Sequence, residues 1–196
     1  DYYLKNNIDS LPLTLEVLEN DKVIRTYTNK KDANFKSWPG GPSKPQILPS
    51  KKGVNRFTWD FRRDALPSIH KVFIFGGLAG SRVAPGKYTL RMTLGDVISE
   101  TEITILPNPK VVSSPEDFIE QQKMLVSIEN TVKEMHESVN QMRSAKTQLS
   151  HYTKLLKDSK NVDSLIEKGK ELTKRINSWE ENLIQAKQKT FQDVIN

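Results

Sequence analysis

The spacing of hydrophobic residues changes once along this chain of 196 residues, and the change limits the folds that the chain can adopt. Up to about Pro107, apolar residues recur at every second position, which is the period of a β-strand with one buried face. After Asn108 they recur every three or four positions, which is the period of an α-helix. We therefore expect a part built from strands to be followed by a part built from helices.

Two β-hairpins are predicted in the first part. The clearer one is KYTLRMTLGDVISETEITIL (87–106), where apolar and polar residues alternate on both sides of Gly95-Asp96. Gly tolerates the positive φ that a two-residue turn requires. The other hairpin is LTLEVLEN (13–20) followed by KVIRTYT (22–28), with its turn at Asn20-Asp21. Short strands with turns rich in Pro and Gly are typical of an antiparallel β-sandwich.

The stretch GVNRFTWDFRRDALP (53–67) begins like a strand and ends in three consecutive charges. Phe57 and Trp59 share one face of the predicted strand, and we interpret them as core residues. Arg62 and Arg63 then form a charged exit with Asp64. We interpret this exit as a strand end that meets solvent or caps neighbouring loops, with an anion-binding contact as the alternative.

The segment NFKSWPGGPSKPQILPSKKG (34–53) is rich in Pro and Gly, so we expect a long loop. Long loops in compact domains are often functional. Trp38 on this loop is a candidate for stacking on a sugar or inserting into a partner. The alternative is that Trp38 folds down as a plug over the sandwich edge.

Ser114-Pro115 begins the helical part, because Ser suits a helix N-cap and Pro suits the first helical position. Apolar residues then repeat every seven positions in two seams, which are joined by the polar stretch 158–161 and predict an antiparallel hairpin with coiled-coil packing. The first seam is Phe118, Leu125, Val132 and Val139 with Ile128, Met135, Met142, Leu149 and Leu156, and the second is Val162, Ile176 and Leu183 with Leu165, Leu172, Trp179 and Ala186. Further apolar side chains widen the seams, so an incomplete three-helix bundle is the alternative.

The predicted fold class is therefore α+β in two segregated parts. Residues 1–109 form an immunoglobulin-like antiparallel β-sandwich, and residues 110–196 form a long helical hairpin. Its helices are expected at about 115–157 and 162–190.

Composition excludes several classes of protein. The chain has no cysteine, which rules out disulfides, thiolate metal sites and a cysteine nucleophile. No apolar run reaches about 20 residues, so no membrane span is predicted. The net charge of +6 arises in residues 1–110, which carry 17 Lys and Arg against 11 Asp and Glu. These charges lie mainly on the Pro/Gly-rich loop without interleaved aromatic residues, so no nucleic-acid partner is expected.

Candidates for catalysis are few. His70, His136 and His151 are far apart in the sequence, have no metal-ligand spacing and are expected at the surface. Asp60 and Asp64 are candidate acids or bases for an enzyme, but two working carboxylates need a cleft between them. We predict no catalytic residue, no metal site and no cofactor.

Four segments together resemble one family. They are YYLKNN…LTLEVLENDKVIRTY (2–27), GVNRFTWDFR (53–62), APGKYTLRMTLGDVISETEITILPNPKV (84–111) and the helical tail from Ser114. They are similar to the C-terminal region of bacterial proteins that carry an N-terminal β-propeller of sortilin-like or neuraminidase-type repeats, often labelled glycosyl hydrolases. Pro85 to Thr89 also resembles the immunoglobulin-like domain of flagellar hook-capping proteins. The family often has an apolar pair where this chain has Arg63-Asp64.

The resemblance implies an extracytoplasmic protein (periplasmic, cell-surface or secreted) whose signal peptide and propeller lie outside this segment. It implies a non-catalytic accessory region that acts by binding and spacing. The expected partners are the propeller of the same chain, a protein or glycan, and a second copy through the helices. The alternative function is a carbohydrate-binding module that uses Trp38.

Overall fold

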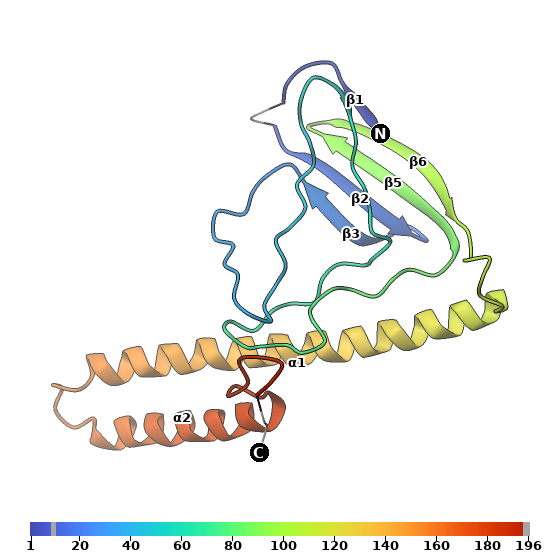
Figure 1. The fold of residues 1–196 in the computed structure, drawn as a ribbon. Coiled ribbons are helices and arrows are strands. Elements are labelled where there is room, and N and C mark those ends of the chain that lie inside the picture. The colour runs from blue at the N-terminus through green and yellow to red at the C-terminus, as the bar shows by residue number, and fades with distance from the viewer. Residues whose placement is uncertain (9–10, 194–196) are drawn as a thin grey trace. The chain divides into compact units, whose positions relative to one another are not determined.

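The computed structural model describes residues 1–8 and 11–193. Antiparallel strands come first in the chain and two helices follow, which confirms the predicted α+β class with a β-sandwich and a helical hairpin (Figure 1).

The larger sheet has four antiparallel strands in the order β3-β2-β5-β6. These strands are β2 (Leu13–Glu19), β3 (Lys22–Thr28), β5 (Gly86–Leu94) and β6 (Val97–Ile105). Both predicted hairpins are confirmed, because β2 pairs with β3 and β5 pairs with β6. Asn20 and Asp21 have φ of 49° and 63°, and Gly95 has φ of 57°, as two-residue hairpin turns require.

The smaller sheet pairs β1 (Tyr2–Leu4) with β4 (Gly53–Asn55). Side chains from the strands and from the long loop, including Leu13 and Leu48, are buried in the core of the sandwich. The regular strand expected from residue 53 onward ends at Asn55. The Asn55 side chain is buried and donates hydrogen bonds to the carbonyls of Lys51 and Gly53, which holds the chain in a local turn.

The hairpin is formed by α1 (Pro115–Leu155) and α2 (Asp163–Leu183). Helix α1 begins with a capping box, because the Asp117 amide donates to Ser114 Oγ at 3.1 Å and the Ser114 amide donates to Asp117 Oδ2 at 2.8 Å. Arg143 hydrogen-bonds to Glu180, and Lys146 hydrogen-bonds to Asn177. The residue numbers of the contacts thus increase along α1 while they decrease along α2. The two helices are therefore antiparallel.

One predicted row of α1 is wrong in part, although its members Met135, Leu149 and Leu156 are half-buried. Ile128 and Met142 are exposed, whereas the polar residues Glu129, His136 and Arg143, also spaced by seven, turn inward. His136 is only 2% exposed, which corrects its expected surface position. The reason is that these polar side chains bind backbone groups of the irregular segments, which no apolar period can reveal.

Helix α2 ends earlier than the expected residue 190. The chain becomes extended at Ile184, with φ of −136° and ψ of 146°. Ile184 is buried in a cluster with Ile69, Val72 and Val139. Burial of this side chain stabilises the extended conformation that ends the helix at this point. Leu165 and Leu172, which belong to the predicted second seam, are exposed.

The chain divides into two compact units that interleave in the sequence. The first comprises Asp1–Lys36, Ser43–Leu66 and Ala79–Glu129, and the second Ser37–Pro42, Pro67–Leu78 and Asn130–Asn196. A boundary between separately folding domains after residue 109 stays a prediction. Residues 194–196 of the predicted helical part lie outside the described residues. None of the described helices is long and apolar enough to cross a membrane.

Candidate functional site

A cleft of about 750 Å³ opens on the sandwich within the first compact unit. Its size lies within the range that is usual for small-ligand pockets. It is lined by residues from β1, from the stretch after β4, and from β2, β5 and β6: Asp1, Tyr2, Tyr3, Leu15, Arg56, Phe57, Thr58, Trp59, Phe61, Leu90, Met92, Ser99, Thr101 and Ile103. Aromatic and aliphatic side chains dominate this lining.

Trp59 lines the cleft and is held from several sides. Its indole N–H donates to the Arg62 carbonyl at 2.9 Å. Its ring meets Phe61 edge-on at a centroid distance of 5.3 Å and Tyr88 at 5.9 Å. Burial raises the pKa of Tyr88 to about 12, and its hydroxyl donates to the Ala84 carbonyl at 2.7 Å. Trp59 is thus a rigid support that also presents apolar surface to the cleft.

The opposite wall is the inner face of β5 and β6. Ser99, Thr101 and Ile103 alternate along β6, and their partners on β5 are Met92, Leu90 and Tyr88. Thr101 is exposed, and Leu90 and Met92 are half-buried. This part of the sheet therefore has an inner face that the smaller sheet leaves accessible.

The rim carries polar groups. Arg56 forms a bidentate ion pair with Asp1, with Nε–Oδ1 at 2.8 Å and Nη2–Oδ2 at 2.9 Å. The Tyr2 hydroxyl donates to the Pro49 carbonyl, and burial raises the pKa of Tyr2. Tyr3 is 64% exposed. The cleft therefore has an apolar interior with hydrogen-bonding groups at its edge.

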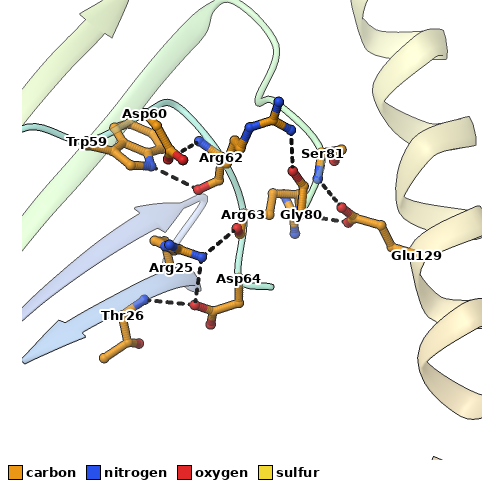
Figure 2. A network of polar contacts seen from close by, with 10 residues as sticks. All are labelled: Arg25, Thr26, Trp59, Asp60, Arg62, Arg63, Asp64, Gly80, Ser81 and Glu129. Atoms are coloured by element: carbon orange, nitrogen blue, oxygen red, sulfur yellow. Dashed lines mark hydrogen bonds and ion pairs between the residues drawn. The ribbon is translucent and has the colours of Figure 1, made fainter. Parts of the chain in front are cut away.

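The charged exit is a structural joint that follows the stretch lining the cleft (Figure 2). The Arg62 guanidinium donates to the Gly80 carbonyl at 2.8 Å, and the Arg62 amide donates to Asp60 Oδ1 at 3.2 Å. The Asp64 carboxylate accepts a hydrogen bond from the Thr26 amide at 3.2 Å. Both carboxylates thus accept backbone amides, as turn and strand connections do.

Arg63 is an enclosed charge of this joint, since its side chain is 13% exposed. Its Nη1 lies 2.9 Å from Glu19 Oε2 and its Nε lies 3.6 Å from Glu129 Oε2. Glu129 also accepts a hydrogen bond from the Ser81 amide (Figure 2). The sequence did not predict this contact, because partners so distant in the chain leave no local signal.

Trp38 lies in the second compact unit, away from solvent on one side. Its indole N–H donates to the Val72 carbonyl at 2.9 Å, and its ring meets His70 edge-on at 5.3 Å. A Cβ on Gly41 would overlap the indole, so the loop backbone covers part of the ring. Trp38 therefore belongs to the second unit, whereas the two predicted arginines belong to the first.

Sequence reasoning missed the cleft itself. Aromatic residues at 2–3 and 57–61 were the available signal, together with the small polar residues Ser99 and Thr101 on the inner face of β6. Among the described residues, no group of three or more His, Cys, Asp or Glu side chains is arranged to hold a metal ion.

A scan against models of protein families, a search of curated proteins and a search of solved structures each found no match to this chain.

Proposed function

We propose that this chain is a non-catalytic interaction module that binds a partner in the apolar cleft of its β-sandwich. The cleft between the aromatic stretch 57–61 and the inner face of β5 and β6 is the observation that carries this proposal. Apolar pockets with a few polar groups at the edge are typical of binding sites.

The cleft is suited to binding because its walls are supported by packing. Trp59 and Phe57 pack against the buried clusters of the sandwich, and Phe57 meets Tyr27 edge-on at 4.7 Å. A surface that is already ordered loses little conformational entropy when a ligand binds. Large aromatic side chains also contribute much of the binding energy at protein interfaces.

Spacing is the second part of the proposed role, and the helical hairpin is suited to it. Helix α1 has 41 residues, which corresponds to about 60 Å at the rise of an α-helix. The resemblance of the sequence supports a setting in an exported bacterial protein next to an N-terminal propeller. This setting is part of the proposal and can be tested by whether the chain binds a separately produced propeller in solution.

The binding role can be tested by filling the cleft. Thr101 and Thr104 are both exposed on β6, but only Thr101 lines the cleft. We expect Thr101→Trp to abolish most of the fluorescence of the apolar probe anilinonaphthalene sulfonate, and Thr104→Trp to leave it unchanged. The same three proteins are then screened against an immobilised peptide library and a glycan array. Equal binding of the probe and of every retained ligand by all three proteins would refute the proposal.

The alternative, a carbohydrate-binding module that uses Trp38, has a separate test. Trp38→Ala is expected to abolish glycan retention in that case, while Thr101→Trp leaves it intact. The hydrogen bond of the indole to Val72 favours a packing role for Trp38 over this alternative.

A further inference from the structure

We propose that the partner of this cleft is an extended polypeptide segment that adds as a strand to the free edge of β6, with apolar side chains entering the cleft and a basic side chain facing Glu102. This inference rests on the proposed function and names the ligand class. Strand addition combines main-chain hydrogen bonds, which supply affinity, with pockets for alternate side chains, which supply specificity.

The two edges of the four-stranded sheet differ in how they are covered. Along β3, the Asp64 amide donates to the Ile24 carbonyl at 2.8 Å, the Thr26 amide donates to Asp64 Oδ1, and Ile47 forms a bridge with Thr28. Across residues 1–8 and 11–193, no strand pairs with the outer edge of β6. Figure 1 shows β6 as the last strand of its sheet. The chain therefore covers one edge and leaves the other available.

The outer edge of β6 presents main-chain groups at every second residue. In a hairpin with a two-residue turn, the residues that flank the turn exchange both hydrogen bonds, here Leu94 and Val97. The register with β5 has no shift, so the odd-numbered residues of β6 bond to β5. Ile98, Glu100, Glu102 and Thr104 consequently direct their N–H and C=O groups outward. An incoming strand would find a regular ladder there.

Apart from the charges of Glu100 and Glu102, β6 lacks the devices that usually protect edge strands. Natural edges carry charged side chains (most often Lys), Pro, a bulge or a covering segment. The sequence of β6 is VISETEITI, which contains neither Pro nor Lys. Its exposed apolar residues Val97 and Ile98 are 68% and 62% exposed. Such an edge favours pairing with another strand.

The cleft lies on the side of β6 toward which a strand would direct every second residue. Ser99, Thr101 and Ile103 form this wall, and Phe57 and Trp59 lie among the residues opposite. A strand hydrogen-bonded beside β6 would continue the sheet, so its inward residues would cover the cleft. Apolar residues at alternate positions would bury the exposed surface of this lining.

Charge on the other face indicates a basic partner. Glu100 and Glu102 lie on the outer face of β6, and Arg91 pairs with Glu100 at 2.5 Å. No ion pair of Glu102 occurs within the described part of the chain, so Lys or Arg on an added strand would find an unpaired carboxylate. An antiparallel pair of two β6 strands centred on Thr101 would instead place Glu100 opposite Glu102. Like charges in that position destabilise a pair, so that register disfavours a second copy, whereas a segment with Lys or Arg opposite Glu102 is favoured.

The test uses the full chain and a library of synthetic peptides as long as β6. Odd peptide positions vary among Val, Ile, Leu and Phe, and even positions vary among Lys, Arg, Thr and Ser. We expect selected peptides to shift the backbone amide resonances of Ile98, Glu100, Glu102 and Thr104. The backbone nitrogens of each selected peptide are then methylated either at the odd or at the even positions. Methylation of the set that bonds to β6 should weaken binding roughly tenfold or more, while methylation of the other set has little effect.

Two variants test the same geometry from the protein side. Glu102→Pro removes an outward N–H without removing a bond to β5, and it should lower affinity strongly. Glu102→Gln keeps the N–H and should lower affinity less, with a weaker dependence on salt. The N-methylated peptides provide an independent measurement if Glu102→Pro unfolds the sheet.

The possible outcomes are distinct. One outcome is that Thr101→Trp abolishes ligand binding, whereas neither methylated set of peptide positions nor Glu102→Pro changes the affinity. The cleft then binds by side chains alone, and strand addition is refuted. Retention of glycans only, or sedimentation as a dimer that Glu102→Pro dissociates, also refutes the peptide-strand inference. Unchanged binding by Thr101→Trp would refute the proposed function together with it.

Discussion

At the residue scale, single charged side chains hold segments that are distant in the sequence. Arg63 joins the strand exit to Glu19 at the end of β2 and to Glu129 on α1. Its carbonyl also accepts a hydrogen bond from Arg25 at 3.0 Å. A charge enclosed in this way stabilises the fold only while its partners are present.

Arg63→Gln is expected to destabilise the protein by about 2–4 kcal/mol, because it leaves the Glu19 and Glu129 carboxylates without their counter-charge. Urea unfolding followed by circular dichroism measures this change. Arg56→Gln is the matched control, since the Arg56 side chain is 81% exposed in its pair with Asp1 and should matter little. Equal unfolding midpoints for the two variants would contradict the role assigned to Arg63.

Glu180 is a second enclosed charge, on α2. Burial by itself would raise its pKa, but hydrogen bonds and positive charge from Arg143, together with Lys146, outweigh burial and lower it. Because the folded-state pKa lies below the ordinary value of 4.5, the ion pair stabilises the fold above that pH. This contribution is lost as the pH falls through the folded-state pKa.

We therefore expect the free energy of unfolding to fall as the pH is lowered below 4.5, and to fall less steeply in Glu180→Gln. The variant should also be less stable by about 1–3 kcal/mol at neutral pH, because Arg143 loses its partner. Urea titrations at a series of pH values measure both effects. Parallel pH profiles for the two proteins would show that Glu180 does not titrate as assigned.

At the scale of elements, the irregular connections are as constrained as the strands. Gly80 lies where the segment before β5 crosses the charged exit, and a Cβ there would overlap the carbonyl oxygens of Arg63 and Asp64. The neighbouring bonds, from the Arg63 amide to the Ser81 carbonyl at 3.0 Å and from the Val83 amide to the Phe61 carbonyl at 2.8 Å, depend on that close approach.

Gly80→Ala is expected to cost about 2–4 kcal/mol of stability, because backbone atoms on both sides have to move. Gly86→Ala is the control, since a Cβ on Gly86 meets only the Tyr88 ring at 3.9 Å, an ordinary contact. Thermal unfolding of both variants measures the two losses of stability. A Gly80→Ala variant as stable as Gly86→Ala would mean that the two segments do not pack closely.

At the scale of the whole molecule, each compact unit combines residues of the helical part with segments that lie much earlier in the chain. Glu129 of α1 belongs to the same compact unit as the sandwich. Ile69 and Val72 belong to the other unit, where they are buried against Val139 and Ile184. The order of residues in the sequence therefore differs from their grouping in space.

A fragment of residues 1–109 tests this grouping. We expect it to be cleaved by protease within 67–78, because Ile69 and Val72 lose the partners that bury them. The full chain should resist cleavage there under the same conditions. A fragment that protects this segment as well as the full chain does would support a domain boundary after residue 109.

The strands and helices were predictable where local chemistry decides them. Alternation together with Asn20-Asp21 and Gly95-Asp96 predicted both hairpins, and Ser114 predicted the start of α1. The cleft was not predictable, because it depends on which residues of β6 remain uncovered by the smaller sheet. The inward polar row of α1 was also missed, since its partners are backbone groups far away in the chain.

The sequence by itself determined the two hairpins, the start of α1 and the change from strands to helices, because hydrophobic period and turn chemistry act between neighbours in the chain. Tertiary structure decided where α2 ends, which charges are enclosed and which sheet edge stays free. Those outcomes follow from burial and hydrogen bonding between residues such as Arg63 and Glu129, or Val72 and Ile184. Such contacts form only once the chain has folded, and they leave no period in the sequence.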